Sequence, residues 1–363
     1  MVAEKKLVPL LFSHHHQHHA PILETHHAKI LNYPEIPRRA EIIREHLFGT
    51  GLMQPVLVET PMPKSEIYQT LDAGMVDYLE AISQDLATLT TESLSTFYSL
   101  KDTDPAHFYR YPSVFPQRDR IYHSHQSLMG LHGYYCFDKD APVGKGTWEA
   151  TLYSATIAHQ GAGMILAGQP LAYSLCRPPG HHASRDLMGG YCYLNNAAIA
   201  ATRLREMGTV AIIDIDYHHG NGTQEIFWND PHVLFTSIHA HPEGEYPYFT
   251  GYAEEIGGPL APHTNLNFPL HAGATEIVFL AAMDELLAGV RAFNPASIVV
   301  SLGFDAFEQD PLGTFKLKAE SYFKIAQKIT ALQLPTLLVQ EGGYAVEMLG
   351  ILAEQFVSGM LSI

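Results

Sequence analysis

The sequence predicts an α/β fold, a single domain over residues 1–363 with an open, mainly parallel sheet of about eight strands and helices on both faces. Short apolar runs of strand length alternate with segments of helix length along the chain. The runs are apolar throughout, as is typical of parallel strands that are buried on both faces. No internal repeat, low-complexity block or linker divides the sequence.

The expected strands are the short apolar runs, several of which lead into a polar loop. Such a strand end, just before a helix, is where open α/β sheets bind their ligands. In chain order the runs cover 7–12, 56–59, 171–176, 210–213, 233–238, 265–269, 296–302 and 336–340.

Helices are expected between these runs, and cap residues mark several of their ends. Pro37 suits a first helical position, where its missing N–H would have no partner in any case. Thr147 is expected to cap a helix, and Asn195 or Asn196 to cap another that Gly208 stops. The expected helices cover 37–47, parts of 64–87, 147–168, 197–207, a start near 224, 275–293, 317–332 and the C-terminal segment.

Two segments have no regular pattern. Residues 93–146 mix aromatic residues, prolines, histidines and glycines, and a connection of this length in a compact domain is usually a lid or a binding loop. Residues 13–27 are rich in histidine, a composition that can bind metal. We expect a solvated loop there, part of which lines a pocket rim.

The composition is that of an ordinary globular protein, and it excludes several classes. The net charge of −16 is opposite in sign to that of a general nucleic-acid binder, and it fits either a cationic substrate or solubility. Three cysteines without paired spacing argue against a disulfide framework and indicate a reducing compartment. No apolar run reaches membrane-spanning length and the N-terminus is a poor secretory signal, so we expect a cytoplasmic protein.

Four of the expected strands end in loops that carry chemically active side chains: PPGHH, DIDYHHGNG, GFD and EGGY. The carboxyl ends of parallel strands share one edge of a sheet, so these loops can meet. Asp214, Asp216 and His218 would lie on one side of an extended backbone, because side chains alternate along it. Carboxylate and imidazole ligands suit zinc or a similar divalent ion. Alternatively, these residues cap a helix and form salt bridges in a loop.

A hydrolytic site can be assembled from these loops. Asp216, His218 and Asp305 would be three zinc ligands that leave a position for water, whose pKa the ion lowers. The two imidazoles of His181 and His182 can act as base, acid or electrostatic stabiliser, unless they are loop filler.

Three further residues could complete this site. Asp214 could fix the tautomer of one imidazole, and Asn221 could orient the other. Tyr344 follows two glycines and could donate a hydrogen bond to an oxyanion, although a packed surface tyrosine is the alternative. No serine or cysteine nucleophile motif is present.

These motifs resemble those of the zinc-dependent deacetylases with the arginase/histone deacetylase fold. The matching motifs, in the family's order and spacing, are SLCRPPGHHA, GGYCYLNNAA, DIDYHHGNGTQEIF, LGFDAFEQDP and EGGY. Within the family the chain looks most like bacterial acetylpolyamine amidohydrolases, on the basis of GYYC, GTWEA, FTGYAEE and FEQDP.

The resemblance implies one zinc ion per chain, bound by Asp216, His218 and Asp305. It also implies a catalytic role for each of five residues. His182 would be the general base and then the general acid, and His181 an electrostatic partner supported by Asp214. Asn221 would stand opposite His182, and Tyr344 would bind the substrate carbonyl. The dimanganese alternative of the arginases needs further aspartates, where this chain has His218.

The resemblance also implies substrate-binding residues and structural ions. Tyr191 and Tyr246 match the aromatic walls of the substrate tunnel, next to Gly190. A structural K⁺ or Na⁺ site would use Asp214, Asp216, His218, Ser237 and Ile238. A possible second monovalent-cation site would use Phe227, Asp230 and Val233.

In the related polyamine enzymes, the insertion that matches residues 93–146 narrows the channel and contributes to a homodimer. We therefore expect a channel rim and a homodimer or dimer-based oligomer here. A glutamate that selects cationic polyamines in the family aligns with Met129. An acylated polyamine and an acyl-lysine protein or peptide therefore both remain candidate substrates.

Three functional hypotheses follow from the sequence. The first is a zinc amidohydrolase that acts on an acylated amine. The second is a non-catalytic module of the same fold that binds acylated amines. The third is a metal-storage or metal-sensing role for the histidines within 13–27.

Overall fold

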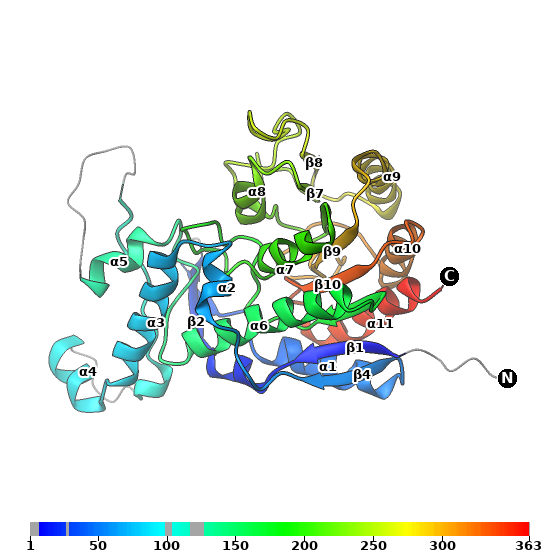
Figure 1. Cartoon of the computed structure of the whole chain (residues 1–363). Helices are drawn as coiled ribbons and strands as arrows, with labels where there is room; N and C mark the ends of the chain where they lie inside the picture. Colours follow the sequence, from blue (N-terminus) through cyan, green and yellow to red (C-terminus); the bar gives the residue numbers. More distant parts are fainter. Residues whose placement is uncertain (1–6, 27–28, 99–103, 117–126, 363) are drawn as a thin grey trace.

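The computed structural model describes residues 7–26, 29–98, 104–116 and 127–362, and its centre is one eight-stranded sheet (Figure 1). Every neighbouring pair of strands in this sheet is parallel. The predicted fold class is therefore confirmed. From edge to edge the strands are β4 (Met53–Leu57), β1 (Val8–Phe12), β5 (Leu171–Ser174), β10 (Thr336–Gln340), β9 (Ser297–Leu302), β6 (Val210–Asp214), β7 (Val233–Ala240) and β8 (Asn265–Leu270).

Helices cover both faces of the sheet. The α-helices of the described residues are α1 (Arg38–Gly49), α2 (Lys64–Tyr68), α3 (Ala73–Ala87), α4 (Thr91–Tyr98), α5 (Leu128–Tyr134), α6 (Thr147–Leu166), α7 (Asn196–Leu204), α8 (Asn221–Phe227), α9 (Glu276–Phe293), α10 (Ala319–Thr330) and α11 (Leu349–Met360). In β6, Ala211 and Ile213 join the core formed with α1, α9, α10 and α11, whereas Val210 and Ile212 join the core formed with α6 and α7. The sheet is buried on both faces, which explains why its strands are apolar throughout.

Most element boundaries lie within a few residues of the predicted ones, and β10 coincides with its prediction. The prediction that Thr147 caps a helix is wrong, because Thr147 is the first residue of α6 and Gly146 occupies the cap position. The Thr147 hydroxyl oxygen instead accepts a hydrogen bond from the Gly144 N–H at 2.8 Å. Asn195 does cap α7, since its side chain accepts from the Ala198 N–H.

The long segment 93–146 has more regular structure than its sequence suggests. Its described parts include α4, α5 and a short 3₁₀ helix, η2 (Pro105–His107), whereas residues 99–103 and 117–126 lie outside the described residues. Figure 1 shows α3, α4 and α5 together at the left of the molecule. Hydrogen bonds between Phe137 N and the Met188 carbonyl oxygen (3.0 Å), and between Met188 N and the Tyr135 carbonyl oxygen (2.7 Å), attach the end of the segment to the loop after β5.

The histidine-rich segment is not a solvated loop in the part that the structure describes. It forms a 3₁₀ helix, η1 (His14–His18), and then β2 (Leu23–His26), which pairs with β3 (Lys29–Asn32). His16 and His19 are buried. Burial lowers the pKa of His16 to about 3, so its ring is neutral at ordinary pH. His27 lies outside the described residues.

Two predictions from composition can be compared with the structure. Cys136, Cys176 and Cys192 are buried free thiols, as expected for a chain without a disulfide framework. Among the described residues there is no helix with the length and apolarity needed to cross a membrane.

Candidate active site

The four loops with chemically active side chains meet at one edge of the sheet. Strands β5, β10, β9 and β6 are consecutive neighbours in the sheet, and the loops PPGHH, EGGY, GFD and DIDYHHGNG follow their carboxyl ends. The convergence expected from the parallel arrangement is therefore present in the structure.

Asp216, His218 and Asp305 form a compact, buried cluster. One ligand atom from each lies within 4.8 Å of the other two. The Nδ1 atom of His218 is 3.1 Å from Asp305 Oδ2 and 3.4 Å from Asp216 Oδ1, so one imidazole nitrogen faces both carboxylates. Burial, followed by the charge of Asp216, raises the pKa of Asp305 to about 7.

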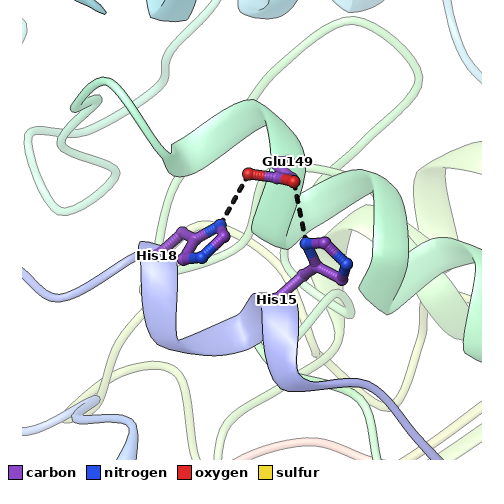
Figure 2. Close-up of side chains that lie close together, drawn as sticks. All are labelled: His15, His18 and Glu149. Atoms are coloured by element: carbon purple, nitrogen blue, oxygen red, sulfur yellow. Dashed lines mark hydrogen bonds and ion pairs between the residues drawn. The ribbon is translucent and has the colours of Figure 1, made fainter. Parts of the chain in front are cut away.

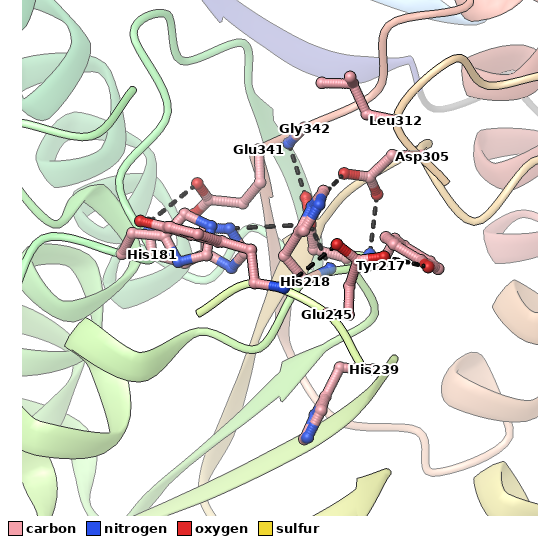
Figure 3. A network of polar contacts seen from close by, with 12 residues as sticks. His181, Tyr217, His218, His239, Glu245, Asp305, Leu312, Glu341 and Gly342 are labelled. Carbon is pink, nitrogen blue, oxygen red and sulfur yellow. Dashed lines mark hydrogen bonds and ion pairs between the residues drawn. The ribbon is translucent and has the colours of Figure 1, made fainter. Parts of the chain in front are cut away.

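Backbone groups hold this cluster in place (Figure 3). Asp216 accepts hydrogen bonds from the N–H groups of Gly342 (2.8 Å) and His218 (3.0 Å), and Asp305 accepts one from the Tyr217 N–H (2.8 Å). A Cβ atom at Gly342 would lie 2.5 Å from Asp305 Oδ2 and 2.6 Å from Asp216 Oδ2. The chain therefore needs glycine where the loop after β10 passes the carboxylates.

This donor set fits a zinc ion. Two carboxylates and one imidazole are among the usual ligands of catalytic zinc, and three protein ligands leave a position open. Burial, followed by the charge of Asp216, raises the pKa of Asp305, and a divalent cation at this position would offset both effects.

His181 and His182 lie side by side but in different electrostatic surroundings. Their ring centroids are 4.0 Å apart, and His181 Nδ1 is 3.0 Å from Asp214 Oδ2. Burial opposes the charged form of His181, but the charges of Asp216 and Asp214 raise its pKa to about 10. Burial, followed by the charge of His181, lowers the pKa of His182 well below its ordinary value.

The partner of His182 determines its tautomer. His182 Nδ1 is 2.7 Å from the side-chain oxygen of Asn221, which can only accept a hydrogen bond. Nδ1 therefore carries the hydrogen, and Nε2 keeps its lone pair. His182 lines the cavity described below.

Tyr344 lines the same cavity. Its backbone N–H and that of Ala345 both donate to Asp310 Oδ2, at 2.6 and 3.0 Å. Burial raises the pKa of the Tyr344 phenol well above its ordinary value, so the hydroxyl remains a hydrogen-bond donor. Asp310 belongs to the FEQDP motif, yet the sequence offered no role for it.

A buried ion-pair network behind the site was not foreseen from the sequence. Arg39 of α1 donates to the carbonyl oxygens of Glu341 (2.7 Å) and Gly343 (2.6 Å), and its guanidinium pairs with Glu35 at 2.6 Å. The carboxylate of Glu341 in turn accepts from Gly180 N at 2.7 Å, which joins the EGGY loop to the loop of the histidine pair. Burial raises the pKa of Glu341 to about 8. The position of Glu341 directly before two glycines was the only signal available in the sequence.

A cavity of about 810 Å³ opens beside His182, His218 and Tyr344. Its walls include Tyr191 and Tyr246, the two predicted tunnel aromatics, and Gly190. A Cβ atom at Gly190 would lie 2.5 Å from the His182 ring, so the wall approaches this imidazole closely there. The end of the 93–146 segment also contributes to the lining, with residues 137–140.

The same cavity contains acidic side chains that the sequence had not marked. Tyr191 donates to Glu24 (2.8 Å), and Tyr246 donates to Asp138 (2.6 Å), so each aromatic wall is backed by a carboxylate. Asp140 and Glu245 complete the acidic lining, and among the described residues that line the cavity Lys139 is the one lysine, with no arginine.

The residues predicted to bind monovalent cations also lie close together. Asp214 and Ser237 are opposite each other in the register of β6 and β7, and Ser237 and Ile238 are buried. In the second set, the Asp230 N–H donates to the Phe227 carbonyl oxygen at 2.9 Å, and the Asp230 carboxylate pairs with Arg205. Cation binding at either position stays a prediction.

The sequence and fold are similar to those of known deacetylases. A family model described as histone deacetylase domain matches residues 33–360. Acetylpolyamine amidohydrolase 2 of Pseudomonas aeruginosa is 40% identical over 328 residues, 90% of each chain. The acetylpolyamine amidohydrolase of Mycoplana ramosa is 37% identical over 355 residues, 97% of this chain and 99% of that one. A crystal structure of acetylpolyamine aminohydrolase from Burkholderia pseudomallei has a TM-score of 0.88 and 32% identity, over 97% of this chain and 98% of that one.

Proposed function

The chain belongs to the histone deacetylase family, and we propose that it is a zinc-dependent amidohydrolase that removes an acetyl group from a cationic amine, with acetylated polyamines as the preferred substrates. The observation that carries this proposal is the buried cluster of Asp216, His218 and Asp305 next to His182 and Tyr344. Hydrolysis of an unactivated amide needs a metal site, a base and an oxyanion donor together.

Asp216, His218 and Asp305 would hold the zinc ion, which would supply Lewis-acid polarisation of the substrate carbonyl and a lowered pKa of water. His182, neutral and with its Nε2 lone pair free, accepts the proton of the attacking water and returns it to the leaving amine. The positive charge of His181, which Asp214 holds in place, favours the negative charge that develops. Tyr344 donates a hydrogen bond to the carbonyl oxygen as that charge forms.

The acidic lining of the cavity supports a cationic substrate. Glu24, Asp138, Asp140 and Glu245 surround a channel whose aromatic walls fit an extended alkyl chain. Burial, the main cause, raises the pKa values of Asp138 and Asp140 only to about 6, so both are charged at neutral pH. They would attract the ammonium groups of a polyamine.

An acyl-lysine peptide is the second candidate substrate. Met129, which aligns with the glutamate that selects polyamines in the family, lies exposed on α5 and provides no negative charge. Glu24, from β2, and Asp138, after α5 in the same 93–146 segment, line the cavity and could replace that charge. The choice between the two substrates therefore depends on this acidic lining.

A rate comparison tests the proposal directly. Zinc-loaded protein is assayed with acetylputrescine, acetylspermidine and an acetyl-lysine peptide, and kcat/KM is expected to be highest for an acetylpolyamine. A higher value for the peptide would transfer the assignment to acyl-lysine. Folded, zinc-loaded protein that hydrolyses none of these substrates and binds no hydroxamate would disprove hydrolysis. If it still bound the acylated amines, it would be the non-catalytic module. The homodimer, the monovalent cations and the cytoplasmic location stay predictions.

A further inference from the structure

A second group of metal-binding side chains lies outside the active site, where η1 meets the first turn of α6. His15, His18 and Glu149 each offer a ligand atom within 4.8 Å of the other two. The Nδ1 atom of His15 is 2.8 Å from one carboxylate oxygen of Glu149, and that of His18 is 2.6 Å from the other. Figure 2 shows both rings pointing from η1 toward this one carboxylate.

The 3₁₀ conformation of η1 creates this arrangement. A 3₁₀ helix has three residues per turn, so residues i and i+3 lie one above the other on the same face. His15 and His18 have this spacing, and their ring centroids are 5.4 Å apart. In an extended strand, residues i and i+3 face opposite sides, so the two rings would point apart.

The surroundings also fix the ring of His15. It stacks on Tyr153 at 3.7 Å between centroids with an interplanar angle of 9°. Tyr153 lies one turn after Glu149 on α6, and its hydroxyl donates to the Glu59 carbonyl oxygen at 2.8 Å. The ring of His15 is therefore held beside Glu149 by a residue one helical turn further along α6.

The donor chemistry selects a class of ion. Two imidazole nitrogens and one carboxylate suit zinc, nickel, cobalt or copper, whereas magnesium and calcium prefer oxygen ligands. Tetrahedral zinc with ligands at about 2.0–2.1 Å places ligand atoms roughly 3.3 Å apart, so the present pairs would open by roughly half an ångström. The side chains of His18 and Glu149 are 49% and 45% exposed, which leaves room for that movement and for water ligands.

We propose that His15, His18 and Glu149 form a second, exchangeable binding site for a divalent transition-metal ion, separate from the active site. The sequence suggested metal binding by the histidine-rich segment as a whole. The proposed site uses two of its histidines, His15 and His18, together with the carboxylate of Glu149 from α6. An ion bound there joins the segment after β1 to the start of α6.

The site also borders elements that lead toward the substrate cavity. His19, directly after η1, has its Nδ1 atom 3.0 Å from the Thr147 hydroxyl oxygen. Tyr193 lies 3.3 Å from the other nitrogen of the His19 ring. The chain then continues to Glu24, which accepts from the tunnel residue Tyr191. Metal binding at the second site is therefore expected to stabilise this part of the molecule.

The test measures zinc binding by the full-length protein, independently of its activity. Zinc content is determined after gel filtration, and further uptake is followed by titration calorimetry with zinc chloride. Wild type is expected to bind a second zinc ion with lower affinity than the first. His15→Ala combined with His18→Ala is expected to abolish this second binding event. Added zinc is also expected to raise the Tm of the wild type but not that of the double variant, because ligands stabilise the state that binds them.

Two further variants make the result specific. Glu149→Gln keeps the size of the side chain and is expected to weaken the second affinity at least about tenfold, since even losing a supporting group costs that much. His14→Ala combined with His107→Ala removes two exposed histidines outside the cluster, and this control is expected to leave the affinity for the second zinc ion unchanged. Tm values measured in chelator verify that each variant is folded.

Three results would overturn this site. They are no second ion in the wild type, the same uptake in the cluster double variant as in the wild type, or equal loss of uptake in the His14/His107 control. None of these results depends on whether the protein hydrolyses an acylated amine.

Discussion

The two clusters of histidine and carboxylate in this molecule use similar ligands in opposite surroundings. Asp216 and Asp305 are buried, the side chain of His218 is 12% exposed, and backbone N–H groups hold both carboxylates. The side chains of His15, His18 and Glu149 are 31%, 49% and 45% exposed, and they are restrained by their mutual pairing and by the stacking of His15 on Tyr153. Ligand type alone therefore does not separate a catalytic site from a peripheral one. The features that distinguish the proposed catalytic cluster are burial, hydrogen bonds that support its carboxylates and an adjacent imidazole.

The largest expected difference between the clusters is in activity. Asp305→Asn removes an anionic ligand from the buried cluster, and kcat/KM is expected to fall about 10³-fold or more, because metal catalysis supplies several kcal/mol. Glu149→Gln makes the equivalent change in the surface cluster and should change activity less than about twofold. Zinc content and steady-state rates are measured on both variants. Comparable activity losses would show that the clusters act as one site.

The next effect separates the base and the oxyanion donor from the metal. His182→Ala and Tyr344→Phe are each expected to lower kcat by about 10²–10⁴-fold while zinc stays bound, since general acid–base catalysis and oxyanion donors contribute such factors. Metal analysis and circular dichroism accompany the kinetics. Near wild-type turnover in either variant would remove that residue from the mechanism.

A smaller effect concerns the acidic lining and pH. Asp138 and Asp140 are charged above about pH 6 and become neutral as the pH falls through that value. The ratio of kcat/KM for acetylputrescine to that for N-acetylbutylamine, which is uncharged, is therefore expected to fall about tenfold from about pH 8 to about pH 5. Titration of His182 affects both substrates and cancels in the ratio. Asp138→Asn should weaken this pH dependence, and a constant ratio in the wild type would contradict electrostatic selection.

The smallest expected effect is on stability without metal. The Glu149 pairs are about half exposed, so Glu149→Gln in chelator should lower the free energy of unfolding by less than about 1 kcal/mol. Urea unfolding provides the measurement. Glu35→Gln is the buried counterpart, because it leaves Arg39 and Arg177 without their carboxylate, and it should cost about 3 kcal/mol or more. Equal losses would mean that the surface cluster is more rigid than its exposure indicates.

Local signals in the sequence explain what could be predicted. The strands were recognisable because two-sided burial makes them apolar throughout, as in β6, where all five residues are buried. The ligand loops were recognisable because parallel strands bring their carboxyl ends to one edge. Both arguments use only short stretches of sequence and the geometry of a parallel sheet.

What was missed depends on contacts between distant residues. Asp138 pairs with Tyr246 across 108 residues and Glu24 pairs with Tyr191 across 167, so neither carboxylate is marked by its neighbours in sequence. The burial of His19 likewise depends on aromatic rings from Tyr109 and Tyr193. Periodicity does not report such contacts, which explains why a histidine-rich segment was mistaken for a solvated loop.

The hydrogen bonds of Arg39 have a consequence for biosynthesis. Its guanidinium binds the carbonyl oxygen of Glu341, 302 residues further along the chain. At about 5–20 residues per second, roughly 15–60 s separate the synthesis of the two partners. Throughout that interval the Arg39 guanidinium can pair with Glu35, but not with the carbonyl oxygens of Glu341 and Gly343. The contacts that join α1 to the EGGY loop therefore form only after Gly343 has been synthesised.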